Sequence, residues 1–183
     1  LLAIYLRHLG YEVVVFDRRP DMRKVGFSGR SINLAISDRG WTALKEAQID
    51  KQIRAPAIPM YKRALHVVDK PLYYQPYGES DQAIYSISRG LLNGTMIDLA
   101  ENRGVIFRFN EKIWDIDLEQ ACIYAGDADK QALTPHQFDV VFGADGAFSR
   151  IRHKMQRQSR FDYSQHFLKV GYKELRIPPN KDG

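Results

Sequence analysis

The sequence lacks the features that define several common classes of protein. It holds a single cysteine, Cys122, so an internal disulfide framework is excluded and a reducing compartment is indicated. Its longest apolar runs, such as Val13–Phe16 and Val140–Phe142, are far shorter than the roughly 20 residues of a membrane helix. No basic leader is visible at the start, so we expect no signal peptide. What remains, 183 residues of which 44% are hydrophobic, predicts one globular domain or two small ones with a real core.

Side chains that could carry out chemistry by themselves are also scarce. No G-x-S-x-G motif marks a serine nucleophile, and Asp115 and Asp117 alternate along an expected strand, where solvated carboxylates are the simpler interpretation. The five histidines are scattered and show no metal-ligand spacing: His8, His66, His136, His153 and His166. These absences favour chemistry carried by a bound cofactor, for which the protein supplies position and electrostatics.

The net charge of +5 raises the question of a nucleic-acid partner. Basic residues, however, alternate with acidic ones throughout the chain, and the densest basic cluster, residues 150–157, is typical of one exposed helix face. No aromatic RNA-binding signature or zinc spacing accompanies this cluster. We therefore expect no nucleic-acid partner.

The first seventeen residues have the pattern of a nucleotide-binding unit. Apolar residues at helical spacing are followed by Gly10, then by the β-branched run Val13–Phe16, which ends on Asp17. A helix, a glycine, a buried strand and a terminal acid form the second half of a dinucleotide-binding βαβ unit, whose acid binds the adenosine ribose. A plain turn residue is the alternative for Asp17. The first strand and its G-x-G-x-x-G loop should precede residue 1, so we interpret the chain as a fragment.

Further along, helical and strand patterns alternate. The sequence predicts a helix over 38–53 and another over 90–104, both with apolar residues at helical spacing. Strands are expected at 63–68, 71–75, 83–87, within 105–127, at 138–143 and near 171–179, and a short helix is expected over 149–156. Parallel-type strands (13–17 and 138–143) thus enclose an antiparallel insertion at about 60–88. This interleaving suggests a large cofactor held between a nucleotide-binding domain and a sheet-built lid.

The stretch Phe138–Arg152 contains the most informative local motif. An apolar run stops at Asp145-Gly146, where a carboxylate could accept hydrogen bonds from sugar hydroxyls and a glycine allows close approach or a positive φ. Ser149 is placed to cap the following helix, and Arg152 either to tie that helix to the loop or to add positive charge. A plain turn is the alternative for Asp-Gly. Arg30 and Arg89, each after a glycine- or serine-rich turn, could likewise reach phosphates or simply lie at the surface.

These residues match a known family. The motif Asp145-Gly-x-x-Ser-x-x-Arg152 resembles the Asp-Gly element of the class A flavoprotein monooxygenases, which have the p-hydroxybenzoate hydroxylase fold. Other stretches, in this order, resemble the kynurenine 3-monooxygenase family more specifically: GRSINLAISDRG (29–40), IPM (58–60), PYG (76–78), SISR (86–89), RFDYSQ (160–165) and GYKELRIPP (171–179). The resemblance covers essentially the whole chain.

The resemblance implies a fold and a domain arrangement. The fold is α/β, with an FAD/NAD(P)-binding Rossmann-like domain of the p-hydroxybenzoate hydroxylase type interleaved with an antiparallel-sheet substrate domain. On this basis residues 1–59 belong to the FAD-binding part without its first strand, 60–88 to the substrate-domain strands, 89–157 to the FAD-binding part with the Asp-Gly motif, and 158–183 to the start of a further substrate-domain segment.

The resemblance also implies site residues. Asp17 matches the acid at the adenosine ribose, with Arg18 and Arg19 beside it. For substrate, Arg63 matches the arginine that pairs with the kynurenine carboxylate and Tyr77 the tyrosine next to it, and a guanidinium fork suits a carboxylate well. The other cofactor-binding matches are Ala35 at the flavin nucleotide, Arg89 near the pyrophosphate and ribityl chain, Ile113 at the adenine end, and Asp145 and Gly146 close to the dinucleotide.

The implied activity is hydroxylation of L-kynurenine to 3-hydroxy-L-kynurenine through a flavin C4a-hydroperoxide, with FAD as cofactor and NADPH and O₂ as co-substrates. No catalytic side chain and no metal are expected. Another class A hydroxylase or oxidoreductase acting on a different aromatic substrate, and a basic binding module without enzyme activity, stay open. The family is compatible with a homodimer, with a cytoplasmic location in bacteria, and with the outer mitochondrial membrane in eukaryotes, through an anchor outside this chain.

Overall fold

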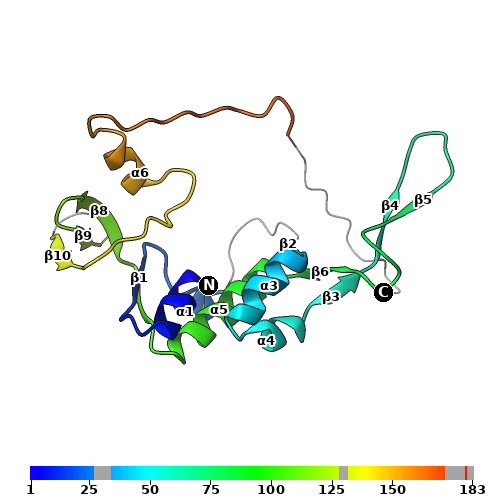
Figure 1. Cartoon of the computed structure of the whole chain (residues 1–183), viewed down its shortest axis with the longest axis horizontal. Coiled ribbons are helices and arrows are strands. Elements are labelled where there is room, and N and C mark those ends of the chain that lie inside the picture. Colours follow the sequence, from blue (N-terminus) through cyan, green and yellow to red (C-terminus); the bar gives the residue numbers. More distant parts are fainter. Residues whose placement is uncertain (27–33, 128–131, 172–179, 181–183) are drawn as a thin grey trace. The chain divides into compact units, whose positions relative to one another are not determined.

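A computed structural model describes residues 1–26, 34–127, 132–171 and 180 (Figure 1). The chain divides into two compact units, of which the first comprises Leu1–Lys112 and the second comprises Ile113–Gly126 together with the later part of the chain. Each unit is described by itself below. Arg30 and the strand expected near 171–179 lie outside the described residues.

The first unit begins with the predicted helix, glycine and strand. Helix α1 (Leu2–His8) ends before Gly10, whose φ of 89° lets the N–H of Tyr11 return to the carbonyl of Leu6 at 3.1 Å. Strand β1 (Val14–Asp17) follows and pairs in parallel with β7 (Ile106–Phe109). The register sets Asp17, the last residue of β1, opposite Phe109. The prediction of a parallel strand ending on an acid is thus confirmed for β1, whereas its predicted burial is only partial, since all of its residues are half-buried.

Helix α5 (Arg89–Glu101) leads into β7 and packs on α1 and on two shorter helices, α2 (Met22–Val25) and α4 (Asp50–Arg54). It is the longest described helix, with 13 residues, and corresponds to the helix expected over 90–104. Among the residues that the structure describes, no helix has the length and apolarity needed to cross a bilayer.

The single helix expected over 38–53 is two helices, α3 (Asp38–Glu46) and α4. They are separated at Gln48, whose φ of 56° lies in the left-handed region, and the N–H of Ile49 closes the turn on the carbonyl of Leu44 at 3.0 Å. The break lets both helices bury apolar side chains in one core, which a straight helix of this length would not do. The prediction of one helix was therefore wrong at Gln48.

Two antiparallel sheets complete the first unit. In the first, β6 (Ile84–Ile87) lies between β2 (Leu34–Ile36) and β3 (Ile58–Met60). In the second, β4 (Lys62–Leu65) and β5 (Tyr73–Pro76) form a two-stranded hairpin with Arg63 opposite Gln75. The strands expected at 63–68, 71–75 and 83–87 correspond to β4, β5 and β6, with β4 ending earlier than expected.

One hydrophobic core joins these elements. It takes residues from α1, β2, α3, α4, β6 and α5, and Ile4, Ile49 and Ile53 are fully buried in it. Trp41 of α3 packs edge-on against Tyr85 of β6, with ring centroids 5.1 Å apart. The guanidinium of Arg54 lies over both rings and donates to the Tyr85 hydroxyl at 2.7 Å, so it closes the core at this end.

The second unit is built around an antiparallel sheet in the order β10-β9-β8, formed by β8 (Lys112–Asp117), β9 (Cys122–Gly126) and β10 (Thr134–Gln137). Ile116, Ile123 and Ala125 are buried, and Cys122 is a buried free thiol at the start of β9, as its interpretation as a small strand residue predicts. Helix α6 (Arg150–Met155) follows the Asp-Gly motif and confirms the short helix expected there.

The strand expected at 138–143 does not form. These residues have no regular structure, and Val140 and Phe142 are 63% and 55% exposed. No described strand pairs with them. A strand between apolar neighbours needs ladder hydrogen bonds from a partner, because unpaired backbone groups cannot be buried. An apolar run alone was therefore not sufficient evidence for a strand.

Replacement of Ile53 should test the core of the first unit. We expect Ile53→Ala to lower the free energy of unfolding by about 2–5 kcal/mol, because it leaves a cavity beside Ile49 and Trp41. Val68→Ala, at a position that is 86% exposed, should change it by less than about 0.5 kcal/mol. Urea denaturation followed by tryptophan fluorescence measures both, and equal losses in the two variants would contradict the assigned core.

Candidate functional site

The carboxylate of Asp17 lies at the carboxyl end of β1, where ligands bind in parallel α/β sheets. It accepts hydrogen bonds from the backbone N–H of Arg19 at 2.9 Å and from Nε and Nη2 of the same arginine at 3.1 and 2.9 Å. Burial acts to raise the pKa of Asp17, but these hydrogen bonds, with the charges of Arg19 and Arg18, lower it overall. Asp17 is therefore an ionised acceptor, and its side chain is 31% exposed. Arg18 beside it is exposed.

Arg89 is the first residue of α5 and follows Ser88, the N-cap residue. It is half-buried, and its guanidinium makes no hydrogen bond or ion pair within the described part of the chain. The start of a 13-residue helix also carries unpaired backbone N–H groups and a partial positive charge. A cation without a partner at such a position suits an anionic ligand. Ala35 lies in the middle of β2 and pairs with Ser86 of β6, three residues before Arg89.

The β4–β5 hairpin brings Arg63 and Tyr77 to one face. The backbone N–H of Tyr77 donates to the carbonyl of Tyr61 at 2.9 Å, which continues the β4–β5 register by one pair. Side chains alternate along a strand, so positions 61 and 63 share a face with their partners 77 and 75. On this face Nε and Nη2 of Arg63 donate to Oε1 of Gln75 at 2.9 and 2.5 Å.

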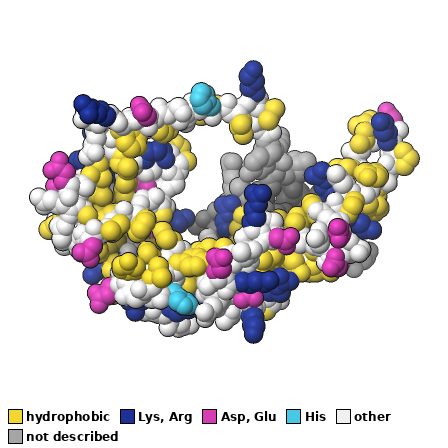
Figure 2. All heavy atoms as spheres, in the orientation of Figure 1, with side chains coloured by type: hydrophobic (Ala, Val, Ile, Leu, Met, Phe, Trp, Pro, Cys, Tyr) yellow, Lys and Arg dark blue, Asp and Glu magenta, His cyan; other side chains and the backbone are white. Residues whose placement is uncertain are grey.

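Exposed aromatic side chains surround Arg63. Figure 2 shows hydrophobic side chains gathered on the hairpin. Tyr61, Tyr73 and Tyr77 are 51%, 59% and 40% exposed, and their positions put them on the same face as Arg63. A guanidinium among tyrosine rings offers a fork for a carboxylate and flat walls for an aromatic group.

In the second unit, the Asp-Gly motif forms the start of α6. Oδ2 of Asp145 accepts from the backbone N–H groups of Arg150 and Ile151 at 2.6 and 3.3 Å, and Oγ of Ser149 accepts from the N–H of Arg152 at 3.0 Å. Gly146 has a φ of 81°, which only glycine adopts readily. The predicted roles of Ser149 as helix cap and of Arg152 as a tie to the loop are confirmed, since the Arg152 guanidinium donates to the carbonyls of Gly146 and Ala147.

Asp145 combines an exposed position with strong local hydrogen bonding. Burial acts to raise its pKa, but the Ser149 hydroxyl and the two backbone N–H groups lower it overall. The carboxylate is therefore ionised at neutral pH and fixed in direction. Ile113, the remaining predicted contact, is half-buried in β8. The predicted site residues thus fall into three groups by element: Asp17, Arg18, Arg19, Ala35 and Arg89 on or beside β1, β2 and α5, Arg63 and Tyr77 on the hairpin, and Ile113, Asp145 and Gly146 on β8 and before α6.

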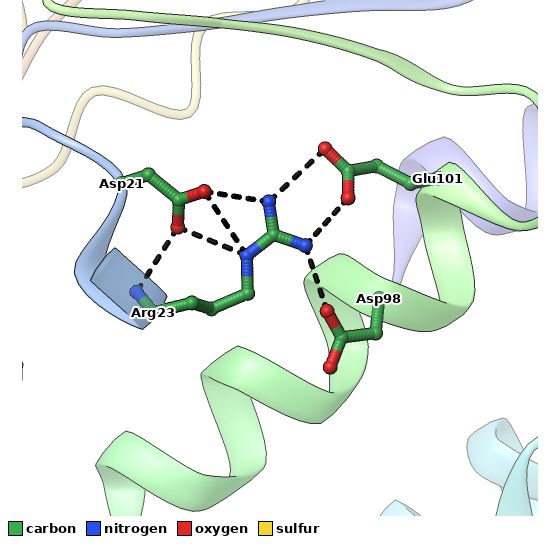
Figure 3. A network of polar contacts seen from close by, with 4 residues as sticks. All are labelled: Asp21, Arg23, Asp98 and Glu101. Atoms are coloured by element: carbon green, nitrogen blue, oxygen red, sulfur yellow. Dashed lines mark hydrogen bonds and ion pairs between the residues drawn. The ribbon is translucent and has the colours of Figure 1, made fainter.

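Sequence reasoning missed two partners. Gln75, which holds Arg63, could have been found from hairpin pairing, because it lies opposite Arg63 once the register is known. Arg23 forms a cluster with Asp21, Asp98 and Glu101 (Figure 3). Asp98 and Glu101 lie 75 and 78 positions after Arg23 in the sequence, and no local pattern links residues so far apart.

Known proteins resemble this chain over its full length. It is 63% identical to a kynurenine 3-monooxygenase of Christiangramia forsetii and 58% identical to one of Flavobacterium johnsoniae, with all of this chain covered in both cases. The chain spans 41% of the length of each of these relatives. No family model matches the sequence.

Solved structures share the fold at low identity. The flavin-dependent monooxygenase PieE, in complex with FAD and substrate, matches 84% of this chain and 29% of its own with a TM-score of 0.69 at 16% identity. A tetrameric form of 2-methyl-3-hydroxypyridine-5-carboxylic acid oxygenase matches 80% of this chain and 36% of its own with a TM-score of 0.67 at 15% identity. These likenesses confirm the expected flavin-dependent hydroxylase fold. The family follows from the sequence relatives: the 63% identity along the whole length of this chain shows that it belongs to the kynurenine 3-monooxygenase family.

Proposed function

We propose that the protein containing this chain is an FAD-dependent, NADPH-using monooxygenase that hydroxylates L-kynurenine to 3-hydroxy-L-kynurenine. The observation that carries the proposal is the hairpin face on which Arg63 and Tyr77 lie together, in a chain 63% identical to a kynurenine 3-monooxygenase. The bacterial origin of the matched relatives supports a cytoplasmic location.

The described residues of the first unit fit a dinucleotide. Asp17 offers an ionised carboxylate to ribose hydroxyls at the end of a parallel strand, with Arg18 and Arg19 on its adenine side. Arg89, whose guanidinium has no hydrogen-bond or ion-pair partner among the described residues, offers that group to the pyrophosphate. Ala35 offers backbone at an exposed point of β2, where its methyl group leaves room for a nucleotide.

In the second unit, the Asp145-Gly146 turn would contribute a fixed carboxylate, and among the described residues other than its chain neighbours no atom lies within 4 Å of the point where a Cβ of Gly146 would lie. A ligand can therefore approach the backbone there. Ile113 would contribute an apolar contact to the adenine end.

The flavin, when bound, supplies the chemistry that activates O₂ with electrons from NADPH, so no side chain of this chain needs to act as a nucleophile. The ring of kynurenine is electron-rich because of its amino group, and this favours oxygen transfer ortho to the nitrogen. The task of the protein is to hold the ring in a reactive position and to keep water away from the reacting atoms.

For the substrate, Gln75 occupies Nε and one donor of Nη2 of Arg63, which leaves the outer N–H groups for a carboxylate. Gln75 thereby orients the fork, and Tyr77 supplies a hydroxyl and a ring beside it. An amino acid with an aromatic ring matches this combination better than an acid without a ring or a ring without an acid.

The visible spectrum and NADPH consumption of the purified full-length protein test the proposal. We expect flavin absorbance near 450 nm, NADPH oxidation stimulated by L-kynurenine, and 3-hydroxykynurenine as the product. If the protein has flavin absorbance but hydroxylates a different aromatic acid, the substrate assignment to kynurenine is wrong and the flavin assignment stands. A protein without flavin absorbance, with salt-sensitive binding to nucleic acid, would contradict the proposal altogether.

Replacing Arg63 should separate substrate binding from flavin binding. Arg63→Ala removes the carboxylate fork, so we expect the KM for kynurenine to rise by about 100-fold, in line with the loss of a charged hydrogen-bonded pair of about 2–3 kcal/mol, with flavin content unchanged. The matched control is Lys62→Ala, because Lys62 is adjacent in β4 and faces the opposite side, over the ring of Tyr74. The assignment is wrong if both variants raise KM equally or if flavin is lost with Arg63.

Two variants can separate the capping role of Asp145 from a role in cofactor binding. Asp145→Asn and Ser149→Ala each weaken the start of α6, by about 0.5–2 kcal/mol for loss of a cap. Only Asp145 is proposed to face the cofactor, so Asp145→Asn should raise the Kd for FAD at pH 7 several-fold more than Ser149→Ala. Titration of the apoprotein with FAD measures both, and equal effects would mean that Asp145 is only a cap.

A further inference from the structure

We propose that Arg23 is a positioning residue for the dinucleotide: it fastens α2 to α5 and so fixes where the guanidinium of Arg89 lies relative to the carboxylate of Asp17. The inference rests on the proposed function, since it concerns the cofactor that Asp17 and Arg89 would hold. It assigns a role to a charged cluster that none of the predicted binding residues belongs to.

The cluster uses every N–H donor of one guanidinium (Figure 3). Nε of Arg23 donates to Asp21, to Oδ1 at 2.9 Å and to Oδ2 at 3.2 Å. Nη1 donates to Asp98 at 2.7 Å and to Glu101 at 2.5 Å, and Nη2 donates to Asp21 at 2.7 Å and to Glu101 at 3.1 Å. Since arginine has five donors in a rigid fork, its orientation is fixed by three carboxylates at once.

The Asp21 side of the contact is shielded from water, whereas its α5 side, at Asp98 and Glu101, is exposed. The side chain of Asp21 is 7% exposed and that of Arg23 is 23% exposed. The hydrogen bonds from Arg23 lower the pKa of Asp21 although burial acts to raise it, and the three carboxylates raise the pKa of Arg23. Shielded, multiply hydrogen-bonded ion pairs lose far more when one partner is removed than exposed pairs do.

Helix α2 depends on this contact. It has only four residues and buries none of them, and a helix of that length is not stable by itself. Asp21 caps it by accepting from the N–H of Arg23 at 3.0 Å, so the same carboxylate starts the helix and anchors its guanidinium. The position of α2 is therefore set by Arg23 rather than by buried apolar side chains.

Arg23 is also connected to Arg89, because its partners Asp98 and Glu101 belong to the helix that begins at Arg89. Asp98 lies nine residues after Arg89 in the same continuous helix, about 13 Å along the axis. A helix moves as a rigid rod over that length, so a tilt at its last turn displaces its first residue. The end of β1 is held by its pairing with β7 and by the N–H of Glu111, which donates to the carbonyl of Asp17 at 3.2 Å. Loss of the Arg23 contact would therefore move Arg89 while Asp17 keeps its place.

The test is FAD affinity in the full-length protein. Arg23→Met keeps the length of the side chain and removes the fork, and we expect the Kd for FAD to rise about tenfold, which corresponds to about 1.4 kcal/mol. Arg23→Lys keeps the positive charge but lacks the planar guanidinium, so its Kd for FAD should lie between the values of the wild type and of Arg23→Met. Arg108→Met is the matched control, because Arg108 makes a single, more exposed ion pair with Glu111 at 3.4 Å, and its Kd should stay at the value of the wild type.

A double-mutant cycle distinguishes positioning from general destabilisation. If Arg23 acts through Arg89, then Arg23→Met should have little further effect in an Arg89→Met background, whereas independent effects would multiply. At saturating FAD, the KM for kynurenine should be unchanged in Arg23→Met. If Arg23→Met fails to fold, Asp98→Asn and Glu101→Gln, which remove one partner each, serve in the same cycle.

The outcomes separate the two proposals. An unchanged Kd in Arg23→Met, or effects of Arg23 and Arg89 that multiply, would overturn the positioning role while leaving a flavin-binding wild type intact. A wild type that binds no FAD would overturn the proposed function and the positioning role with it. FAD binding with the expected cycle, but without product from kynurenine, would support the positioning role and overturn the substrate assignment alone.

Discussion

The parallel pairing of β1 with β7 is the constraint on which the first unit depends. Two parallel strands cannot be joined by a tight turn, so the intervening chain must cross over, and here it does so with α5 directly before β7. This crossover packs α5 against α1 and closes the core around Ile4 and Ala100. It also sets Asp17 at the end of one strand and places a helix that starts at Arg89 in the same unit. The cofactor proposal needs both consequences, because it uses Asp17 at the end of β1 and Arg89 at the start of α5, and both places depend on the pairing of β1 with β7.

The sequence predicts those features that depend on residues adjacent in the chain, and not those that depend on contacts between distant residues. The helix, glycine and strand at residues 2–17 were predictable because a C-terminal glycine and a β-branched run act over a few residues. The hairpin and the cap of α6 were predictable for the same reason. The break at Gln48 could not be predicted, because glutamine is not a residue typical of turns. Only the burial of both helices in one core offsets the cost of a left-handed backbone conformation there. The prediction of a strand at 138–143 was wrong because a strand needs hydrogen bonds to a neighbouring strand, and the apolar run in one segment does not show whether such a neighbour exists.

The candidate site shows the same division. Asp17, Asp145 and Ser149 could be recognised because their roles at strand and helix ends are expressed in adjacent residues. Gln75 could be found only once the hairpin register is known, and Arg23 could not be found, because its partners in α5 are brought near by the fold from far along the chain. The family resemblance supplied Arg63 and Tyr77, and the hairpin register then explains why these residues, fourteen positions apart, lie on one face. Resemblance identified the residues, whereas pairing gives the physical reason for their arrangement.

The three groups differ in how much the protein already satisfies them, and this difference bears on what each can bind. The carboxylate of Asp145 is engaged by two backbone N–H groups, and Asp17 by one arginine, so both keep their direction with or without a ligand. Arg63 is held by a neutral amide, which orients it without neutralising its charge. Arg89 alone among them has no partner within the described residues, and a half-buried cation in that state costs free energy that an anionic ligand would recover. Arg89 is thus the residue that an anionic ligand would satisfy most, and Arg23 joins the last turn of its helix to α2.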